Sequence, residues 1–418
     1  MHNSQSEENL PDNRPRAGLC NATSMVTPQR AQQARESVIS AKRIAVITKF
    51  RFMGDTVVAT PFIGQLRKHL PNAEIDLLAA PCIVDTFANC PHLNRIIPVD
   101  MTGVSRWQHG KDLRSLLLQG RYDVAFVLNR SLHCAVTTAI SKVPVRIGYA
   151  NELRRFLMTV PIPYVFDRNE VDCHLDMLRS IGLSADDALP DLWITESERA
   201  KVSAALAKFG WSSGATIGLQ PGANDPYIRE WGAEKFARVA EELRKEVDGD
   251  IVLMGGKSEL PTIERTEAAL LAIPGAKAPI NLGGKLGLRD ALATIGLCGV
   301  WLGNDTGLLH CAVAQRVASI GVFGPNKVVR WGYDAPRHRS IVSFPSVPAR
   351  DDEAVRRALD AISVDEVLAA AREVMREPRI DAPDLASPLS VPTGAPARAP
   401  YYAATLQPAV AASPVRRR

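Results

Sequence analysis

The sequence lacks several features that would each point to a particular class of protein. It has no apolar run near the ~20 residues that a bilayer-spanning helix needs, and its first residues are polar and acidic, unlike a signal peptide. The Gly-x-Gly-x-x-Gly motif of dinucleotide-binding folds is missing, as are the Gly-x-Ser-x-Gly elbow and the Gly-x-x-x-x-Gly-Lys-Ser/Thr loop. These absences argue against a membrane-spanning protein, an NAD-dependent oxidoreductase, and the simplest hydrolase and P-loop kinase classes.

The sequence also lacks a large excess of positive or negative charge, and it lacks closely spaced cysteine pairs. The chain has 50 Lys and Arg residues against 45 Asp and Glu, and the net charge of +5 is spread out, so no nucleic-acid footprint is visible. The cysteines number seven, and none are spaced as Cys-x-x-Cys, which predicts reduced core thiols in the cytoplasm. No His, Cys, Asp or Glu cluster has zinc spacing, and no Asp-x-Asp ends a strand. We therefore expect no metal and no cofactor.

Apolar strands alternate with amphipathic helices in two separate series. The expected strands span residues 43–48, 74–79, 95–99 and 122–128 in the first series, and 216–220, 250–254, 300–302 and 319–323 in the second. Alternation of this kind is typical of doubly wound parallel sheets. The sequence thus predicts an α/β protein with two tandem Rossmann-like domains and a ligand-binding cleft between the carboxyl ends of their sheets.

Composition sets the expected domain limits. We expect a disordered N-terminal extension at 1–41, a first Rossmann-like domain at 42–195 and a second at 196–348. A C-terminal helix is expected at 349–377, packing back across the cleft, and the Pro- and Ala-rich residues 378–418 are expected to be a disordered tail.

A short loop follows the first strand and ends in Gly54-Asp55 at the start of a helix. Asp55 suits an ordinary helix cap, which is the commoner role for Asp at such a position. Its place at the expected cleft also leaves open a role as general base.

Two loops of the second series carry charged side chains at the corresponding edge. Arg229 follows Pro221-Gly222 and suits a diphosphate, although a solvated surface arginine is commoner. Glu259 follows Gly255-Gly256 and could accept hydrogen bonds from a ribose or a ring amine, or simply favour the dipole of its helix.

The segment from Asn304 to His310 joins an apolar strand to a helix. Free backbone N–H groups at a helix start can bind phosphate, so Asp305-Thr306-Gly307 suits a phosphate cradle. Asp and Thr before a helix are also ordinary caps. His310, one turn further on, either lines the same cleft or fills a gap in the core.

These three segments, in this order, resemble glycosyltransferase family 9, the ADP-heptose:lipopolysaccharide heptosyltransferase family. The resemblance rests on 49–61 with Gly54-Asp55, on 221–231 with Arg229, and on 304–310 followed by Phe323-Gly324-Pro325. It covers residues 43–344. His174 is similar to a histidine that the family carries before the second domain. Asn224-Asp225-Pro226 departs from the family, which often has small hydroxylated residues there.

The resemblance implies the GT-B architecture, with an acceptor domain first and a nucleotide-sugar domain second. Asp55 matches the family's catalytic base, and Gly54 and Arg51 fall on the acceptor side. Arg229 stands where the family binds the donor phosphates, and Glu259 loosely matches its nucleoside-binding glutamate. The remaining donor-binding residues are Asp305, Thr306, Gly307, Leu308 and His310.

The implied reaction is metal-independent, inverting transfer of a heptose from ADP-heptose to a lipopolysaccharide core or related glycan. A nucleoside diphosphate leaves without needing a proton, so one carboxylate suffices where hydrolases pair two. Three alternatives remain. The chain could be a family member that uses another nucleotide sugar or acceptor, or a non-catalytic nucleotide-sugar-binding protein, which would be expected to lack Asp55. The third is an NAD-dependent oxidoreductase, which would need the glycine motif that this sequence lacks.

The family also implies a cytoplasmic enzyme in peripheral contact with the inner membrane, where its glycolipid acceptor grows. Basic residues of the first half, namely Arg51, Arg67, Lys68 and Arg106, suit a phosphorylated lipid or an anionic sugar. Equally, they suit solvated helix surfaces.

Overall fold

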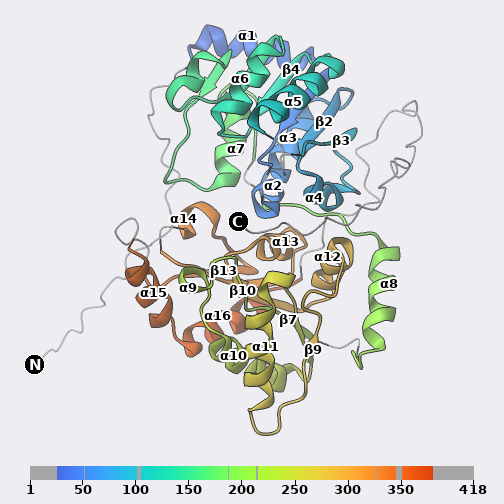
Figure 1. Ribbon diagram of the computed structural model, residues 1–418, viewed down its shortest axis with the longest axis vertical. Coiled ribbons are helices and arrows are strands. Elements are labelled where there is room, and N and C mark those ends of the chain that lie inside the picture. Colours follow the sequence, from blue (N-terminus) through green and yellow to red (C-terminus); the bar gives the residue numbers. More distant parts are fainter. Residues whose placement is uncertain are drawn as a thin grey trace, which may run out of the picture.

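Two α/β domains lie one above the other in the computed structural model, which describes residues 26–50, 52–100, 105–186, 188–212, 215–325, 327–344 and 351–379 (Figure 1). The first domain holds a six-stranded sheet in the order β3-β2-β1-β4-β5-β6, with all neighbours parallel. Its strands are β1 (Arg43–Ile47), β2 (Glu74–Ala79), β3 (Arg95–Pro98), β4 (Val124–Val127), β5 (Val145–Tyr149) and β6 (Val160–Ile162).

The second domain holds a seven-stranded sheet in the order β12-β13-β11-β10-β7-β8-β9, parallel except for β12 against β13. Its strands are β7 (Thr216–Gln220), β8 (Asp250–Leu253), β9 (Ile280–Asn281), β10 (Val300–Asn304), β11 (Ala318–Val322), β12 (Asp334–Ala335) and β13 (His338–Ile341). The predicted α/β class with two tandem Rossmann-like sheets is confirmed.

Helices cover both sheets, as parallel sheets require. Those before and within the first domain are α1 (Pro28–Ile39), α2 (Met53–Val57), α3 (Thr60–His69), α4 (Pro81–Val84), α5 (Arg106–Gly120), α6 (Leu132–Ile140) and α7 (Glu170–Arg179), with 3-10 turns η1 (Asp85–Phe87) and η2 (Glu152–Phe156). The later ones are α8 (Glu196–Ala207), α9 (Pro226–Arg229), α10 (Ala233–Val247), α11 (Leu260–Leu271), α12 (Leu288–Gly296), α13 (Gly307–Ala314), α14 (Val328–Trp331), α15 (Asp352–Ala361) and α16 (Val364–Arg376), with η3 (Lys257–Glu259).

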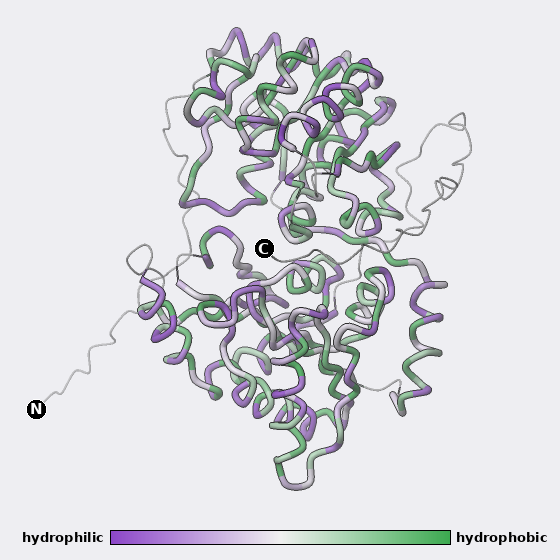
Figure 2. Tube along the Cα trace, in the orientation of Figure 1, coloured by the Kyte–Doolittle hydropathy of each residue, from purple (hydrophilic) through white to green (hydrophobic). Residues whose placement is uncertain are grey.

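The central strands are continuous apolar runs because both of their faces are covered. Ile44 to Ile47 of β1 are fully buried, and the hydropathy-coloured trace shows such segments running through the middle of each domain (Figure 2). Ile47 pairs with Leu78 of β2 and Val127 of β4, so these three strands end together. The loops that follow them therefore emerge at one edge, which faces the second domain.

The N-terminal extension expected to be disordered is partly helical, so that prediction is wrong for residues 28–39. Thr27 caps α1 through its hydroxyl, and Ala34 and Val38 are buried in the core of the first domain. Small and polar residues hide this helix in the sequence because only one narrow face is apolar. The rest of the extension, residues 1–25, lies outside the described residues.

The single C-terminal helix expected at 349–377 is two helices, and they do not cross the cleft. Ser363 breaks the run and caps α16 by accepting a hydrogen bond from the Glu366 backbone N–H at 3.1 Å. Leu359, Val367 and other buried side chains of α15 and α16 join the core of the second domain. The tail expected at 378–418 lies outside the described residues, apart from Pro378 and Arg379.

The connection between the two domains is anchored to both of them. The Asp191 backbone N–H donates to Thr60 Oγ1 of the first domain at 2.8 Å, and its carboxylate pairs with Arg316 of the second at 2.5 Å. Among the described residues, no helix combines the length and apolar composition needed to cross a bilayer.

Candidate active site

The two domains meet where α2 abuts the start of α13. A Cβ added to Gly54 would lie 2.7 Å from His310 Cδ2 and 3.4 Å from Gly307 Cα. A Cβ added to Gly307 would lie 2.9 Å from the end of the Met53 side chain. Two glycines, one from each domain, thus leave room for α2 and α13 to come into contact. This contact sets the Gly54-Asp55 segment against the segment that runs from Asp305 to His310.

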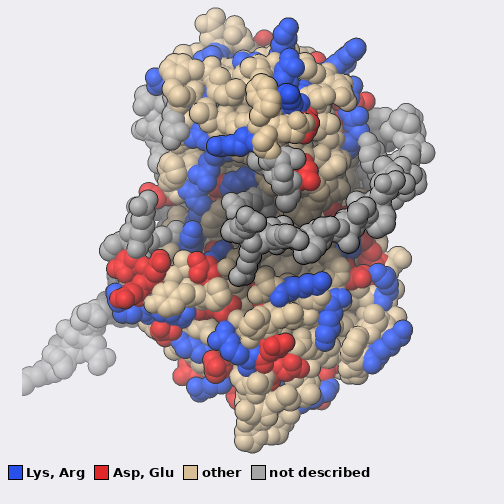
Figure 3. Space-filling view, in the orientation of Figure 1, with Lys and Arg blue, Asp and Glu red and all other residues tan. Residues whose placement is uncertain are grey.

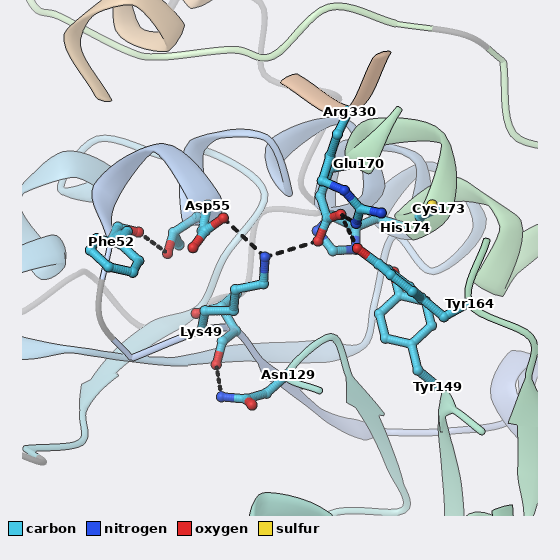
Figure 4. Close-up of polar contacts among 12 residues, drawn as sticks. Lys49, Phe52, Asp55, Asn129, Tyr149, Tyr164, Glu170, Cys173, His174 and Arg330 are labelled. Carbon is cyan, nitrogen blue, oxygen red and sulfur yellow. Dashed lines mark hydrogen bonds and ion pairs between the residues drawn. The ribbon is translucent and has the colours of Figure 1, made fainter. Parts of the chain in front are cut away.

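Asp55 lies in the first turn of α2 but does not cap it. The cap position belongs to Phe52, and no side chain caps this helix. Instead, Asp55 Oδ1 accepts a hydrogen bond from Lys49 Nζ at 2.9 Å, and the carboxylate is only 12% exposed (Figure 4). The second carboxylate oxygen of Asp55, Oδ2, accepts no hydrogen bond from any of the described residues. The simple capping role is therefore not what the geometry shows.

Thr306 stands at the cap position of α13 without capping it. Its hydroxyl donates to Gln220 Oε1 at 2.5 Å, and Gln220 Nε2 in turn donates to Glu259 Oε1 at 3.0 Å. The second oxygen of Glu259 accepts from the Gly256 backbone N–H at 2.5 Å. A chain of hydrogen bonds thus joins three of the strand-end loops of the second sheet and fixes a buried carboxylate there.

Arg229 and Asp305 form an ion pair. Arg229 Nη2 lies 3.1 Å from Asp305 Oδ2 and also donates to the Asp305 backbone carbonyl. About a third of the arginine side chain, 34%, stays exposed, whereas Asp305 is 10% exposed. The guanidinium is thus held beside the start of α13 with part of its donor surface free for an anion.

His310 is buried beside Asp305, and the charge of Asp55 also acts on its ring. Its Nδ1 is hydrogen-bonded to Tyr333 Oη at 2.6 Å, and its Nε2 lies 4.0 Å from Asp305 Oδ1. Burial lowers the pKa of His310, and the opposing pull of Asp305 and Asp55 does not overcome it, so the ring is neutral at neutral pH. His310 therefore both packs in the core and faces the contact with Gly54.

The other predicted residues have simpler positions. Leu308 is half-buried and packs against the core beneath α13. Asn304, which opens the same motif, is fully buried and structural, since its amide bonds the Trp231 N–H and the Pro221 carbonyl. Arg51, predicted on the acceptor side, lies outside the described residues.

Two residues named from the sequence are built into the first domain. Arg67 is buried and donates to the backbone carbonyls of Leu70, Pro71 and Ala73, so it is not available to an anionic lipid. His174 is buried with its Nδ1 on Tyr149 Oη at 2.7 Å, and burial lowers the pKa of His174 to about 4.

Two charged residues at the site were missed. Glu170, the first residue of α7, is fully buried and accepts a hydrogen bond from Lys49 Nζ at 2.9 Å. Arg330 of α14 reaches it from the second domain (Figure 4). In the sequence, Glu170 looks like any acidic residue in a first turn, and only the fold brings these side chains together. Lys and Arg side chains gather along this part of the seam between the domains (Figure 3).

Comparison with protein families identifies the family of this chain. Residues 107–357, more than half of the chain, match glycosyltransferase family 9 (heptosyltransferase). Arg229, Glu259 and the segment from Asp305 to His310 lie inside the matched range, whereas Asp55 precedes it.

Curated relatives are similar over most of their length. Lipooligosaccharide heptosyltransferase 2 of Haemophilus ducreyi is 26% identical over 294 residues, which cover 66% of this chain and 81% of the relative. Lipopolysaccharide heptosyltransferase 3 of Escherichia coli is 23% identical over 357 residues, covering 80% and 97%.

Solved structures share the fold. A glycosyl transferase family 9 protein from Veillonella parvula superimposes with a TM-score of 0.72 at 22% identity, covering 80% of this chain and 97% of the other. ADP-heptose LPS heptosyltransferase II of Escherichia coli gives a TM-score of 0.65 at 23% identity, covering 80% and 98%. The predicted GT-B architecture is confirmed.

Proposed function

Because the chain belongs to glycosyltransferase family 9, we propose that it transfers a heptose from ADP-heptose to a lipopolysaccharide core or a related glycan acceptor. The observation that carries this proposal is the contact between α2 and α13. It sets the Asp55 segment of one domain against the segment from Asp305 to His310 of the other.

On the donor side, the start of α13 and Arg229 bind the diphosphate. The first N–H groups of α13 have no side-chain cap, and the partial positive charge of a helix start favours a phosphate. Arg229 adds a guanidinium whose fork geometry suits phosphate oxygens. Glu259, held by Gln220 and Gly256, supplies carboxylate oxygens for the hydroxyls or amine of the nucleoside.

On the acceptor side, Asp55 acts as the general base. Lys49 occupies Asp55 Oδ1, and Oδ2 takes the proton of the acceptor hydroxyl. The hydroxyl oxygen bonds to the anomeric carbon while the bond to the diphosphate breaks on the opposite face. The nucleoside diphosphate leaves with that electron pair, and the anomeric centre is inverted. The charge that develops on the leaving phosphate is stabilised by Arg229 and the α13 N–H groups, without a metal.

Asp55→Ala tests this assignment. We expect a loss of ~10²–10⁴ in turnover, the usual contribution of a general base, with donor affinity unchanged by calorimetry. Product is followed by mass spectrometry with ADP-heptose and with other nucleotide sugars, so that the same assay identifies the donor. Wild-type turnover in Asp55→Ala contradicts the base assignment, and a preference for a hexose donor contradicts the proposed sugar.

The proposal also includes peripheral contact with an anionic membrane through α6. This helix has no charged residue, and its exposed positions Leu132, Val136 and Ile140 are spaced four apart, at 42%, 40% and 53% exposure. Phe156 of the adjacent η2 is exposed, and Arg155 lies over its ring. An apolar stripe beside basic side chains suits the surface of a bilayer with anionic headgroups.

Sedimentation with vesicles tests this contact. We expect the protein to bind phosphatidylglycerol vesicles more strongly than phosphatidylcholine vesicles, and we expect Val136→Gln with Ile140→Gln to weaken that binding. The control is Leu271→Gln, which removes an equally exposed leucine from the second domain. Equal binding by both variants would remove α6 from the proposal.

A further inference from the structure

Glu170 is an unusual carboxylate because it is fully buried and has three charged or polar partners (Figure 4). Its Oε1 accepts from Lys49 Nζ at 2.9 Å. Its Oε2 accepts from Tyr164 Oη at 2.6 Å and from Arg330 Nη1 at 2.9 Å. A buried carboxylate is costly unless it is paired, and here every pairing reaches a different part of the chain.

Lys49 links Glu170 to Asp55. Its ammonium lies 2.9 Å from both Glu170 Oε1 and Asp55 Oδ1, so it bridges two carboxylates. Trp331 of the second domain lies against the same ammonium, with its ring centroid 4.9 Å away. A lysine side chain has several rotatable bonds, and its tip is fixed only where partners hold it. Glu170 is the second partner, and it holds Lys49 on one oxygen of Asp55.

The Arg330 contact depends on the position of the second domain. Arg330 belongs to α14, and the neighbouring Gly332 carbonyl accepts a hydrogen bond from Asn169 Nδ2 at 3.0 Å. Two carboxylates, Asp55 and Glu170, are thus balanced by one cation from each domain. If the domains separate, Glu170 loses one of its two cations.

We propose that Glu170 is a positioning residue: it fixes Lys49 on Asp55 Oδ1 so that Oδ2 faces the acceptor, and Arg330 completes this arrangement only when the domains are in contact. This inference rests on the proposed role of Asp55 as general base. It adds that closure of the domains also orients the base, through the linked side chains of Arg330, Glu170, Lys49 and Asp55.

A double-mutant cycle between Glu170→Gln and Asp55→Ala tests the inference. In the wild-type background, we expect Glu170→Gln to lower kcat on the order of 10²-fold, as a ~1 Å misplacement of a reacting group does, with donor affinity unchanged. In the Asp55→Ala background, we expect Glu170→Gln to leave the residual rate unchanged, because Glu170 acts only through the base.

Asp76→Asn is the matched control. Asp76 is also a fully buried carboxylate of the first domain, and it too is held by one arginine, Arg95, and one tyrosine hydroxyl, that of Tyr122. The Asp76→Asn substitution should lower the melting temperature about as much as Glu170→Gln does, while leaving kcat unchanged.

Arg330 supplies a second variant that does not remove the buried carboxylate. Arg330→Gln should lower kcat, whereas Arg330→Lys, which keeps a cation opposite Glu170, should retain most of it. Equal losses from Glu170→Gln in both backgrounds, or full activity of Arg330→Gln, would overturn the positioning role alone. Normal turnover of Asp55→Ala would overturn the proposed function and this inference with it.

Discussion

Gly54→Ala should slow the enzyme without unfolding it. The added Cβ would lie 2.7 Å from His310 Cδ2, so the domains would have to shift by about 0.7 Å to reach an ordinary contact of 3.4 Å. His310 has little freedom to move, because Tyr333 Oη holds its Nδ1 at 2.6 Å. Overpacking of this kind costs about 1–3 kcal/mol. Because the contact joins the two domains, the added Cβ destabilises their closed arrangement relative to a separated one, and not the fold of either domain.

A cost of 1–3 kcal/mol corresponds to roughly a 5- to 150-fold change in the equilibrium constant between the closed and separated arrangements of the domains. We therefore expect kcat to fall by up to this factor. The melting temperature should change little, because alanine is favoured over glycine in a helix by about 1 kcal/mol, which offsets part of the strain. The assay is steady-state transfer at saturating donor and acceptor, with thermal unfolding measured alongside.

Gly64→Ala is the matched control, because it places a Cβ 3.7 Å from the ring of His92, an ordinary contact within the first domain. It should leave kcat unchanged. Wild-type kcat in Gly54→Ala, or an equal loss in Gly64→Ala, would refute the reasoning. A higher acceptor KM at unchanged kcat would instead support the prediction that Gly54 lies on the acceptor side.

Two further predictions concern donor binding and pH. Arg229→Ala should weaken ADP-heptose binding by roughly 10- to 100-fold, because a hydrogen bond to a charged group contributes about 1.5–3 kcal/mol, and unchanged affinity by calorimetry would exclude its phosphate role. Burial lowers the pKa of His174 from 6.5 to about 4, so the unfolded chain takes up a proton first as pH falls below 6.5. Titration of His174 alone should lower stability by about 2 kcal/mol between pH 7 and 5, and His92 and His338, whose pKa values burial also lowers, add to this drop. Denaturant unfolding at both pH values should show a smaller drop in His174→Asn, and equal drops would contradict this origin.

The sequence predicts those strands that are continuous apolar runs, since full burial leaves a visible mark. It does not reveal β6, which contains Pro161, or β13, which includes His338 and Arg339. β6 lies at the edge of its sheet, where a proline is tolerated, and β13 lies one strand in from the edge, where His338 is buried and the other three residues are half-buried. Pro61 does mark a helix start in the sequence, because proline is favoured in the first turn of a helix and α3 begins at Thr60.

Some residues of the candidate site can likewise be predicted from the sequence, and others cannot. Asp55, Arg229 and Asp305 follow strands, and local sequence is enough to place them at the carboxyl edges of the two sheets. Glu170 cannot be found in this way, because its partners Lys49 and Arg330 are 121 and 160 residues away. Only the fold, which brings α7 and α14 to Lys49 in the loop after β1, gives this carboxylate a role.

The arrangement of the sheets along the chain has a consequence for biosynthesis. All strands of the first sheet precede residue 163, so the first domain can fold on the ribosome before the second has been made. At about 5–20 residues per second, synthesis of residues 183–379 takes roughly 10–40 s. During that interval, the edge that later meets the second domain faces water and chaperones. Lys49, Asp55 and Glu170 lie at this edge, so the nascent surface carries charged side chains as well as apolar ones until the second domain covers it.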